Sequence, residues 1–268
     1  MLSFVFKSRL PQISSSPVIR DLLKSFHINR PIKRNEVLGW DVNKVLNALR
    51  SPPFEPLQEC PLRKLTQKCI FLVALATAKR IGELQALSYK VVKKSPDLIL
   101  SYLPHFIAKT ESAANPVPRA FPLKSLKDFV GNLEEELTVC PVRCLKFYLN
   151  KTCNISPRPK TLFVSPRNQT RPLSKNAISF FLRDLITKFG LPQNERNSRP
   201  RAHSIRAMAA SLAFHKNCPV DKIIETATWR TNSVFSSFYL KDLAFEHENL
   251  NSLSPVVVAG QVTGPSQS

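Results

Sequence analysis

Glycine, acidic residues and long apolar runs are all scarce in this chain of 268 residues. Its 6 glycines against 22 prolines disfavour a sheet protein rich in tight turns and favour helices that are separated by proline. No run approaches the ~20 apolar residues that a membrane-spanning helix needs, so we expect a soluble protein that is not inserted into a membrane. The hydrophobic fraction of 43% is enough to form a core, which excludes a wholly disordered chain.

The shortage of acidic residues leaves a strongly basic protein. The chain has 39 Lys and Arg but only 19 Asp and Glu, a net charge of +20. Such a balance predicts a polyanionic partner, most simply nucleic acid. Composition alone would suit RNA or an anionic lipid surface as well, so it narrows the partner without defining the chemistry.

The 6 cysteines do not form the pattern of a metal site. None is part of a C-x-x-C pair, and no histidine lies beside them at zinc-finger spacing. Cys140 and Cys144 would lie on one side of an expected helix. The simplest interpretation is that both are small buried apolar residues. We therefore expect no metal and no cofactor. The sequence shows no convincing secretory signal, which favours an intracellular protein.

Hydrophobic periodicity predicts a mainly helical chain. Asp41 and Ser174 are expected to cap helices, and Gly190 to end one. The stretch 62–87 is the most apolar and is expected at the centre of the core. The expected helices span 42–50, 62–87, 141–151, 175–189, 203–216, 220–228 and 234–243.

A different pattern separates the second and third of these helices. Short apolar runs at 98–103, 106–108 and 120–123, interrupted by the polar segment 111–119, are typical of a small antiparallel meander. A further brief strand is expected at 162–165. The predicted fold class is therefore mainly α with a small antiparallel β-sheet, an α+β fold.

Composition divides the chain into three regions. Residues 1–40 form a basic arm broken by prolines, and the first twenty also fit an organellar transit peptide. Residues 41–245 form one domain of catalytic size. Residues 246–268 are expected to be a flexible tail, because helical periodicity is lost there.

Two pairs of side chains suit chemistry on a phosphodiester. Arg80 and Glu83 lie one helical turn apart in KRIGELQAL, and His203 and Arg206 have the same spacing in AHSIR. Two arginines can bind the non-bridging oxygens of a phosphate, because a guanidinium binds in a bidentate way and stays charged. His203 can accept or share a proton.

Three further side chains complete this set. Tyr239 can attack phosphorus and hold the strand as a phosphotyrosine, provided that nearby cations help its phenol to ionise. Lys109, expected at the exposed end of a strand just before the hairpin turn, can protonate the leaving 5′ oxygen. The indole N–H of Trp229 can donate to a non-bridging oxygen. Each residue alone would more often be structural, but the combination favours a site.

In this order the residues resemble the signature of the tyrosine recombinases, which are phage-integrase-like enzymes. TAKRIGELQAL is similar to the first arginine box, RAHSIRAMAASLAF to the His-x-x-Arg box, and WRTNSVFSSFYL to the terminal Trp-to-Tyr segment. GWDVNKVLNAL and CPVRCLKFYL are most similar to recombinases of DIRS- and Ngaro-type eukaryotic retroelements. The resemblance covers roughly residues 39–243.

The resemblance implies a catalytic-domain fold and a function in recombination and integration of a mobile element. Double-stranded DNA would be cut one strand at a time through a 3′-phosphotyrosine and exchanged in a synaptic tetramer, without metal or nucleotide. A eukaryotic element further implies a nuclear location. The implied roles are nucleophile for Tyr239, phosphate binding for Arg80 and Arg206, general acid for Lys109, proton handling for His203, hydrogen bonding for Trp229 and orientation for Glu83.

A basic stretch between residues 158 and 206 is a candidate DNA-binding surface. It contains eleven Lys or Arg and only two acidic residues, which favours contact with DNA phosphates and a steep dependence on salt. A solvated basic face is the simpler alternative. The expected contact residues are Lys175, Arg183, Lys188, Arg196, Arg199 and Arg201.

One departure from the family pattern leaves alternatives open. The roughly forty residues before the match are too few for the helical core-binding domain that the family usually has there, and VIRDLLKSF would be a remnant of it. The chain could therefore be a DNA-binding remnant that does not cleave. A third interpretation is an activity like that of type IB topoisomerases, which share the chemistry.

Overall fold

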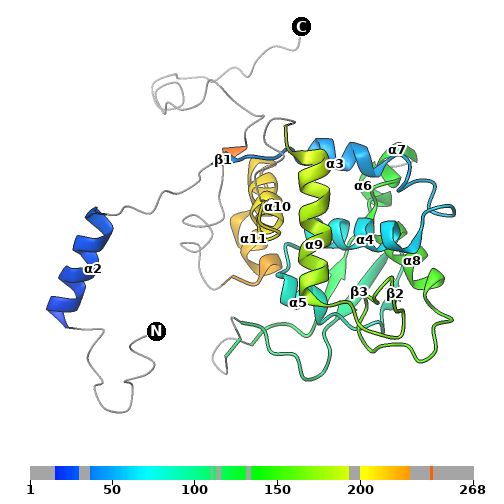
Figure 1. The fold of residues 1–268 in the computed structure, drawn as a ribbon, viewed down its shortest axis with the longest axis horizontal. Helices are drawn as coiled ribbons and strands as arrows, with labels where there is room; N and C mark the ends of the chain where they lie inside the picture. Colours follow the sequence, from blue (N-terminus) through cyan, green and yellow to red (C-terminus); the bar gives the residue numbers. More distant parts are fainter. Residues whose placement is uncertain are drawn as a thin grey trace, which may run out of the picture. The chain divides into compact units, whose positions relative to one another are not determined.

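The computed structural model of the chain describes residues 16–29, 37–109, 111–112, 116–130, 134–192, 200–229 and 242–243. The chain divides into two compact units, residues 1–36 and residues 37–268. The first unit contains helix α2 (Pro17–Asn29), and the second contains all the other described elements (Figure 1). In α2, Val18, Leu22 and Phe26 are exposed. Their spacing of four residues places them on one face of the helix.

The second unit confirms the predicted fold class, mainly helical with a small antiparallel sheet (Figure 1). Strands β2 (Val92–Lys94), β3 (Asp97–Ser101) and β4 (Ala120–Leu123) pair in that order, and both pairings are antiparallel. The described helices of this unit are α3 (Val42–Leu49), α4 (Leu62–Thr77), α5 (Ile81–Gln85), α6 (Lys127–Val130), α7 (Glu134–Leu137), α8 (Pro141–Lys151), α9 (Lys175–Leu185), the π-helical turn η2 (Ile186–Gly190), α10 (Ser204–His215) and α11 (Val220–Ala227).

Helix α4 forms the centre of the core, as its apolar sequence predicts. It packs against α8, α9 and α10, and its apolar side chains are buried along most of its length. Lys68 of α4 is also fully buried, and its Nζ donates to the Leu49 carbonyl at 2.7 Å and to Glu55 Oε1 at 2.5 Å. Arg143 of α8 binds the same carboxylate. The buried charges are therefore paired, as burial requires.

The single helix expected over 62–87 is in fact two helices. Helix α4 ends because Ala78 adopts the left-handed conformation (φ 48°), with its N–H donating to the Ala74 carbonyl. Arg80 then caps α5. The left-handed conformation usually favours glycine, but the sequence has neither glycine nor proline between Leu62 and Ile81. Periodicity alone therefore gave no sign of this break.

The other predicted helix ends agree with the structure. The Asp41 side chain accepts hydrogen bonds from the backbone N–H groups of Asn43 and Lys44. The Ser174 hydroxyl accepts one from the Ala177 N–H at 3.2 Å. Helix α9 runs into the π-helical turn η2, which ends at Gly190. The stop at Gly190 is therefore confirmed, although the last turn before it is not α-helical.

Several expected strands and one expected helix differ from the structure. Strand β2 was not predicted, whereas residues 106–108 and 162–165 form no strand. The latter segment makes only an isolated bridge, from Val164 to Pro172. Within the predicted helix 234–243, residues 242–243 form strand β5 (Asp242–Leu243), parallel to β1 (Val37–Leu38). The rest of that helix and the expected tail, 246–268, lie outside the described residues.

Alanine substitution at two glycines is expected to change the free energy of unfolding in opposite directions. A Cβ at Gly190 would lie 3.1 Å from Val45 Cγ2 and 3.2 Å from Trp40 Cε3, whereas one at Gly82 would meet only the Lys175 side chain, at 3.8 Å. We expect Gly190→Ala to lower the free energy of unfolding by roughly 1–3 kcal/mol through overpacking. Gly82→Ala, in helix α5, should raise it by up to about 1 kcal/mol. Urea unfolding measures both changes, and equal effects would contradict this packing.

Candidate active site

Five of the seven expected catalytic and orienting residues lie in elements that meet at the end of α4. Arg80 is the N-cap of α5, and Glu83 lies in its first turn. His203 is the N-cap of α10, and Arg206 lies in the first turn of that helix. Trp229 follows α11, which packs against α10. The sixth residue, Lys109, lies in an exposed turn between β3 and β4, and the seventh, Tyr239, lies outside the described residues.

A buried carboxylate lies between the two arginines. Glu83 is 2% exposed, and its Oε1 accepts a hydrogen bond from Arg80 Nη1 at 3.0 Å. Its Oε2 accepts one from the Arg80 backbone N–H at 2.7 Å and lies 3.8 Å from Arg206 Nη1. The arrangement fixes the direction of the Arg80 side chain, which remains 19% exposed. This geometry fits the orienting role expected for Glu83, which stays a prediction.

The Arg206 guanidinium is almost entirely inside the protein. Its Nη1 donates to the Ala78 carbonyl and its Nη2 to the Ala227 carbonyl, each at 2.6 Å. The same guanidinium lies over the Trp229 ring, 4.7 Å from its centroid. Arg206 thus joins the end of α4, the end of α11 and the indole. Because its side chain is only 1% exposed, an external phosphate reaches it only after neighbouring groups move.

His203 lies at the surface beside these cations. Partial desolvation lowers its pKa from the ordinary value, and the positive charges of Arg206, Arg80 and Lys109 lower it further. The imidazole is therefore neutral at pH 7 and suited to accept a proton. The Lys109 charge therefore acts on His203 electrostatically.

The position of Lys109 corrects one expectation. The residue was expected at the end of a strand, but β3 ends at Ser101 and Lys109 lies in a turn before β4. The Glu111 N–H donates to the Ala108 carbonyl across this turn. Lys109 is exposed there, so its ammonium is accessible to a ligand.

A second lysine, Lys79, lies inside the cluster, and it was not among the expected site residues. It is 6% exposed. Its Nζ donates to the Thr226 carbonyl at 2.9 Å and lies 4.6 Å from the centroid of the Phe121 ring. Burial lowers the pKa of Lys79 to about 8, the Arg206 charge adds to this, and the Glu83 charge opposes it. A charged residue at the end of the most apolar helix was the available signal in the sequence.

A buried phenol, also missed, lies near the same charges. The hydroxyl of Tyr102 has no hydrogen-bond partner within the described part of the chain. Burial raises the pKa of Tyr102, and the nearby Glu83 carboxylate raises it further. Tyr102 therefore stays protonated and is not suited to be a nucleophile.

Four of the six expected DNA contacts fall within the described residues, and Arg196 and Arg199 fall outside them. Lys175, Arg183, Lys188 and Arg201 are all exposed. Lys188 forms an ion pair with Asp184 at 2.9 Å. The Lys175 Nζ lies 3.9 Å from the position that a Cβ on Gly82 would take, so it lies beside α5, the helix that Arg80 caps. Their role in binding DNA stays a prediction.

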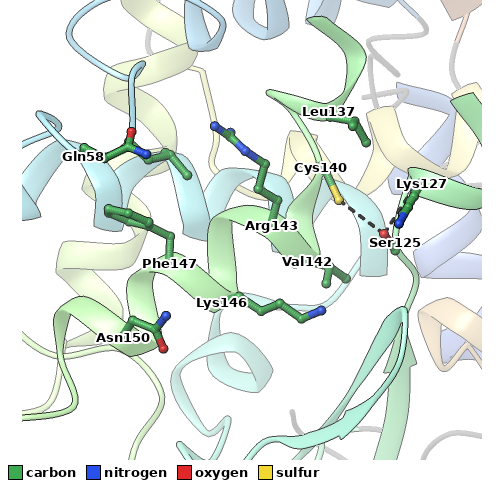
Figure 2. Close-up of a pocket in the computed structure, with 11 residues that line it drawn as sticks. Gln58, Ser125, Lys127, Leu137, Cys140, Val142, Arg143, Lys146, Phe147 and Asn150 are labelled. Carbon is green, nitrogen blue, oxygen red and sulfur yellow. Dashed lines mark hydrogen bonds between the residues drawn. The ribbon is translucent and has the colours of Figure 1, made fainter. Parts of the chain in front are cut away.

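A cavity of about 410 Å³ lies beside α8 and is separate from this cluster (Figure 2). None of the expected site residues lines it. In its wall the Ser125 hydroxyl lies 3.8 Å from Cys140 Sγ, which Figure 2 shows as a dashed line. The described ranges contain no group of three or more His, Cys, Asp or Glu side chains that could hold a metal ion. No helix in those ranges is both long and apolar enough to span a bilayer.

The chain is similar to a family of known proteins and to solved structures. Residues 42–244 match the phage integrase family. The crystal structure of XerA recombinase is similar at 14% identity and a TM-score of 0.50, covering 90% of this chain and 78% of that chain. Lambda integrase (75–356), a dimer bound to a COC′ core site, is similar at 16% identity and a TM-score of 0.45, covering 88% of this chain and 76% of that chain. None of the curated proteins matches the chain.

The effect of the Lys109 charge on His203 predicts a linked titration. We expect His203 to titrate below the usual value of about 6.5 and its pKa to rise in Lys109→Met, because one charge that opposes protonation is gone. Lys109→Arg keeps that charge and serves as the control. NMR titration of the imidazole measures all three proteins. The same pKa in all three would show that Lys109 does not act on His203.

Proposed function

The chain belongs to the phage integrase family, the tyrosine recombinases, and on that basis we propose that it cleaves and rejoins DNA through a phosphotyrosine formed by Tyr239. The observation that carries this proposal is the pairing of Arg80 and Arg206 on the buried Glu83 carboxylate. Two guanidinium groups in a fixed arrangement are what a developing phosphorane needs, since its negative charge is spread over two non-bridging oxygens.

The proposed reaction uses the cluster without a metal. The Tyr239 oxygen bonds to phosphorus while its proton passes to neutral His203, and the bond from phosphorus to the 5′ oxygen breaks. Lys109 donates a proton to that oxygen. Rejoining reverses both transfers, with a 5′ hydroxyl attacking the phosphotyrosine and Tyr239 leaving. The Trp229 indole is proposed as a hydrogen-bond donor to the phosphate.

The two arginines are not equivalent in this proposal. Arg80 is partly exposed, whereas Arg206 is buried and bonded to two backbone carbonyls. Arg80 therefore meets the incoming phosphate first. Arg206 contributes its charge from inside the protein and contacts the phosphate directly only when the site opens on DNA.

The proposed partner is double-stranded DNA, which the exposed cations of α9 approach near the site. Lys175 lies beside α5, and Arg183 lies farther along the same helix. Their contacts with phosphates would make binding steeply dependent on salt. We further propose self-association into a tetramer on DNA, an origin in a DIRS- or Ngaro-type mobile element and a nuclear location. These finer assignments rest on the sequence resemblance.

A second candidate is a protein that binds DNA without cleaving it. The burial of Arg206 favours this candidate, because two of its N–H groups are already bonded to Ala78 and Ala227. The two functions share the fold and the basic surface. They differ in whether a covalent adduct with DNA forms.

Covalent trapping distinguishes the two candidates. A pool of nicked duplexes of varied sequence lets a cleaved fragment diffuse away and traps the phosphotyrosine. We expect a denaturant-resistant adduct with the parent chain and with Tyr89→Phe, the control, but none with Tyr239→Phe. Electrophoresis of the labelled DNA measures it.

Each other outcome of this experiment has a defined meaning. DNA binding by the parent without any adduct would support the second candidate. An adduct that persists in Tyr239→Phe would exclude Tyr239 as the nucleophile. Relaxation of supercoiled plasmid without sequence preference would indicate an activity like that of type IB topoisomerases.

Arg80→Lys tests the geometry of phosphate binding separately from charge. We expect the single-turnover rate of cleavage to fall on the order of 10²-fold, because an ammonium cannot reproduce the bidentate fork. The control is Arg63→Lys, at the other end of α4, where Arg63 stacks over Phe181. A wild-type rate in Arg80→Lys would contradict the role of Arg80.

A further inference from the structure

The last turn of α11 is bound by two cations from other parts of the chain. Helix α11 ends at Ala227, so its final carbonyls have no partner within the helix. Lys79 Nζ donates to the Thr226 carbonyl at 2.9 Å, and Arg206 Nη2 donates to the next carbonyl, that of Ala227, at 2.6 Å. Cations are favourable at this end of a helix because the peptide dipoles place partial negative charge there.

The position of Trp229 depends on this last turn. Thr228 adopts the left-handed conformation (φ 55°) and ends the helix. The Trp229 N–H then donates back to the Ile224 carbonyl at 3.0 Å. The indole packs with its ring against the Arg206 guanidinium. A shift of the last turn of α11 would therefore move the indole relative to Arg206.

We infer that Lys79 is a positioning residue, which fixes the end of α11 to the start of α5 and so sets where Trp229 lies against Arg206. Lys79 directly precedes Arg80, so one short segment presents Arg80 to the phosphate and binds the helix that carries Trp229. Arg206 bridges Ala78 and Ala227. Lys79 adds a second connection, which prevents rotation about the first.

The surroundings of Lys79 show that the ammonium is not needed to fill space. Lys79 lines a cavity of about 770 Å³ together with apolar side chains such as Leu72, Leu75 and Phe121. A methionine would fit this wall without the cost of burying a charge. The compensation for that cost is the hydrogen bond to Thr226 and the contact with the Phe121 ring.

The experiment compares three substitutions in the full chain. Lys79→Met removes the donor, and Lys79→Arg restores one, since the adjoining cavity leaves room for the larger side chain. Lys222→Met is the matched control, because Lys222 lies on α11, lines the same cavity and is exposed. If Lys79→Met does not fold, Lys79→Gln, which is too short to reach the carbonyl in the same way, replaces it.

Two measurements are made on each protein. The chain has 2 tryptophans, so ¹⁵N-tryptophan labelling gives two indole signals, which Trp40→Phe assigns. The Trp40 indole, which donates to Ser204 Oγ at 3.1 Å, is an internal reference. We expect Lys79→Met to shift the Trp229 signal and speed its hydrogen exchange at least about tenfold, with the Trp40 signal unchanged. Lys79→Arg should restore the parent signal, and Lys222→Met should keep it.

The second measurement is the single-turnover rate of adduct formation, and this part rests on the proposed function. We expect about a tenfold loss in Lys79→Met, unchanged affinity for DNA and recovery in Lys79→Arg. An unchanged Trp229 signal in Lys79→Met would overturn the inference, whatever the rate. A shifted signal with a parent rate would overturn the link to the reaction. If the parent forms no adduct, the proposed function fails, while the indole signals still decide the placement of Trp229.

Discussion

The candidate site depends on the contacts of the buried Arg206 guanidinium. This guanidinium binds the carbonyl that ends α4, the carbonyl that ends α11 and the face of Trp229, and it lies close to the Glu83 carboxylate. A buried cation without such partners would be strongly destabilising. The same contacts that satisfy it therefore bring three separate segments of the chain together. In this fold, stability and the assembly of the site share one side chain.

The excess of positive charge around Glu83 gives the site its electrostatic character. The Glu83 carboxylate pairs with Arg80 and Arg206. Burial lowers the pKa values of Lys79 and His203, and the positive charges of Arg80 and Arg206 lower both further. A site with uncompensated positive charge favours an anion over water. The recombinase chemistry that the family implies needs that property, because negative charge builds up at phosphorus in the transition state.

Local rules predicted the elements that depend on neighbouring residues. Asp41 and Ser174 cap their helices as expected, and Gly190 ends the turn that follows α9. The failures have a common cause. The break at Ala78 depends on a left-handed residue that carries a Cβ, and its carbonyl is bound by Arg206, 128 residues away in the sequence. No periodicity within a window of the chain contains that information.

The sequence by itself determined the residue types of the candidate site and their order, because guanidinium, imidazole and phenol groups have fixed chemistry wherever they lie. It also determined the helical class, because periodicity and caps act within a few residues. Only the tertiary structure decided which groups are buried. In the folded chain Arg206 lies inside the protein. Burial lowers the pKa of Lys79, whose ammonium donates to the Thr226 carbonyl. Desolvation and long-range hydrogen bonds depend on segments that meet only when the chain has folded.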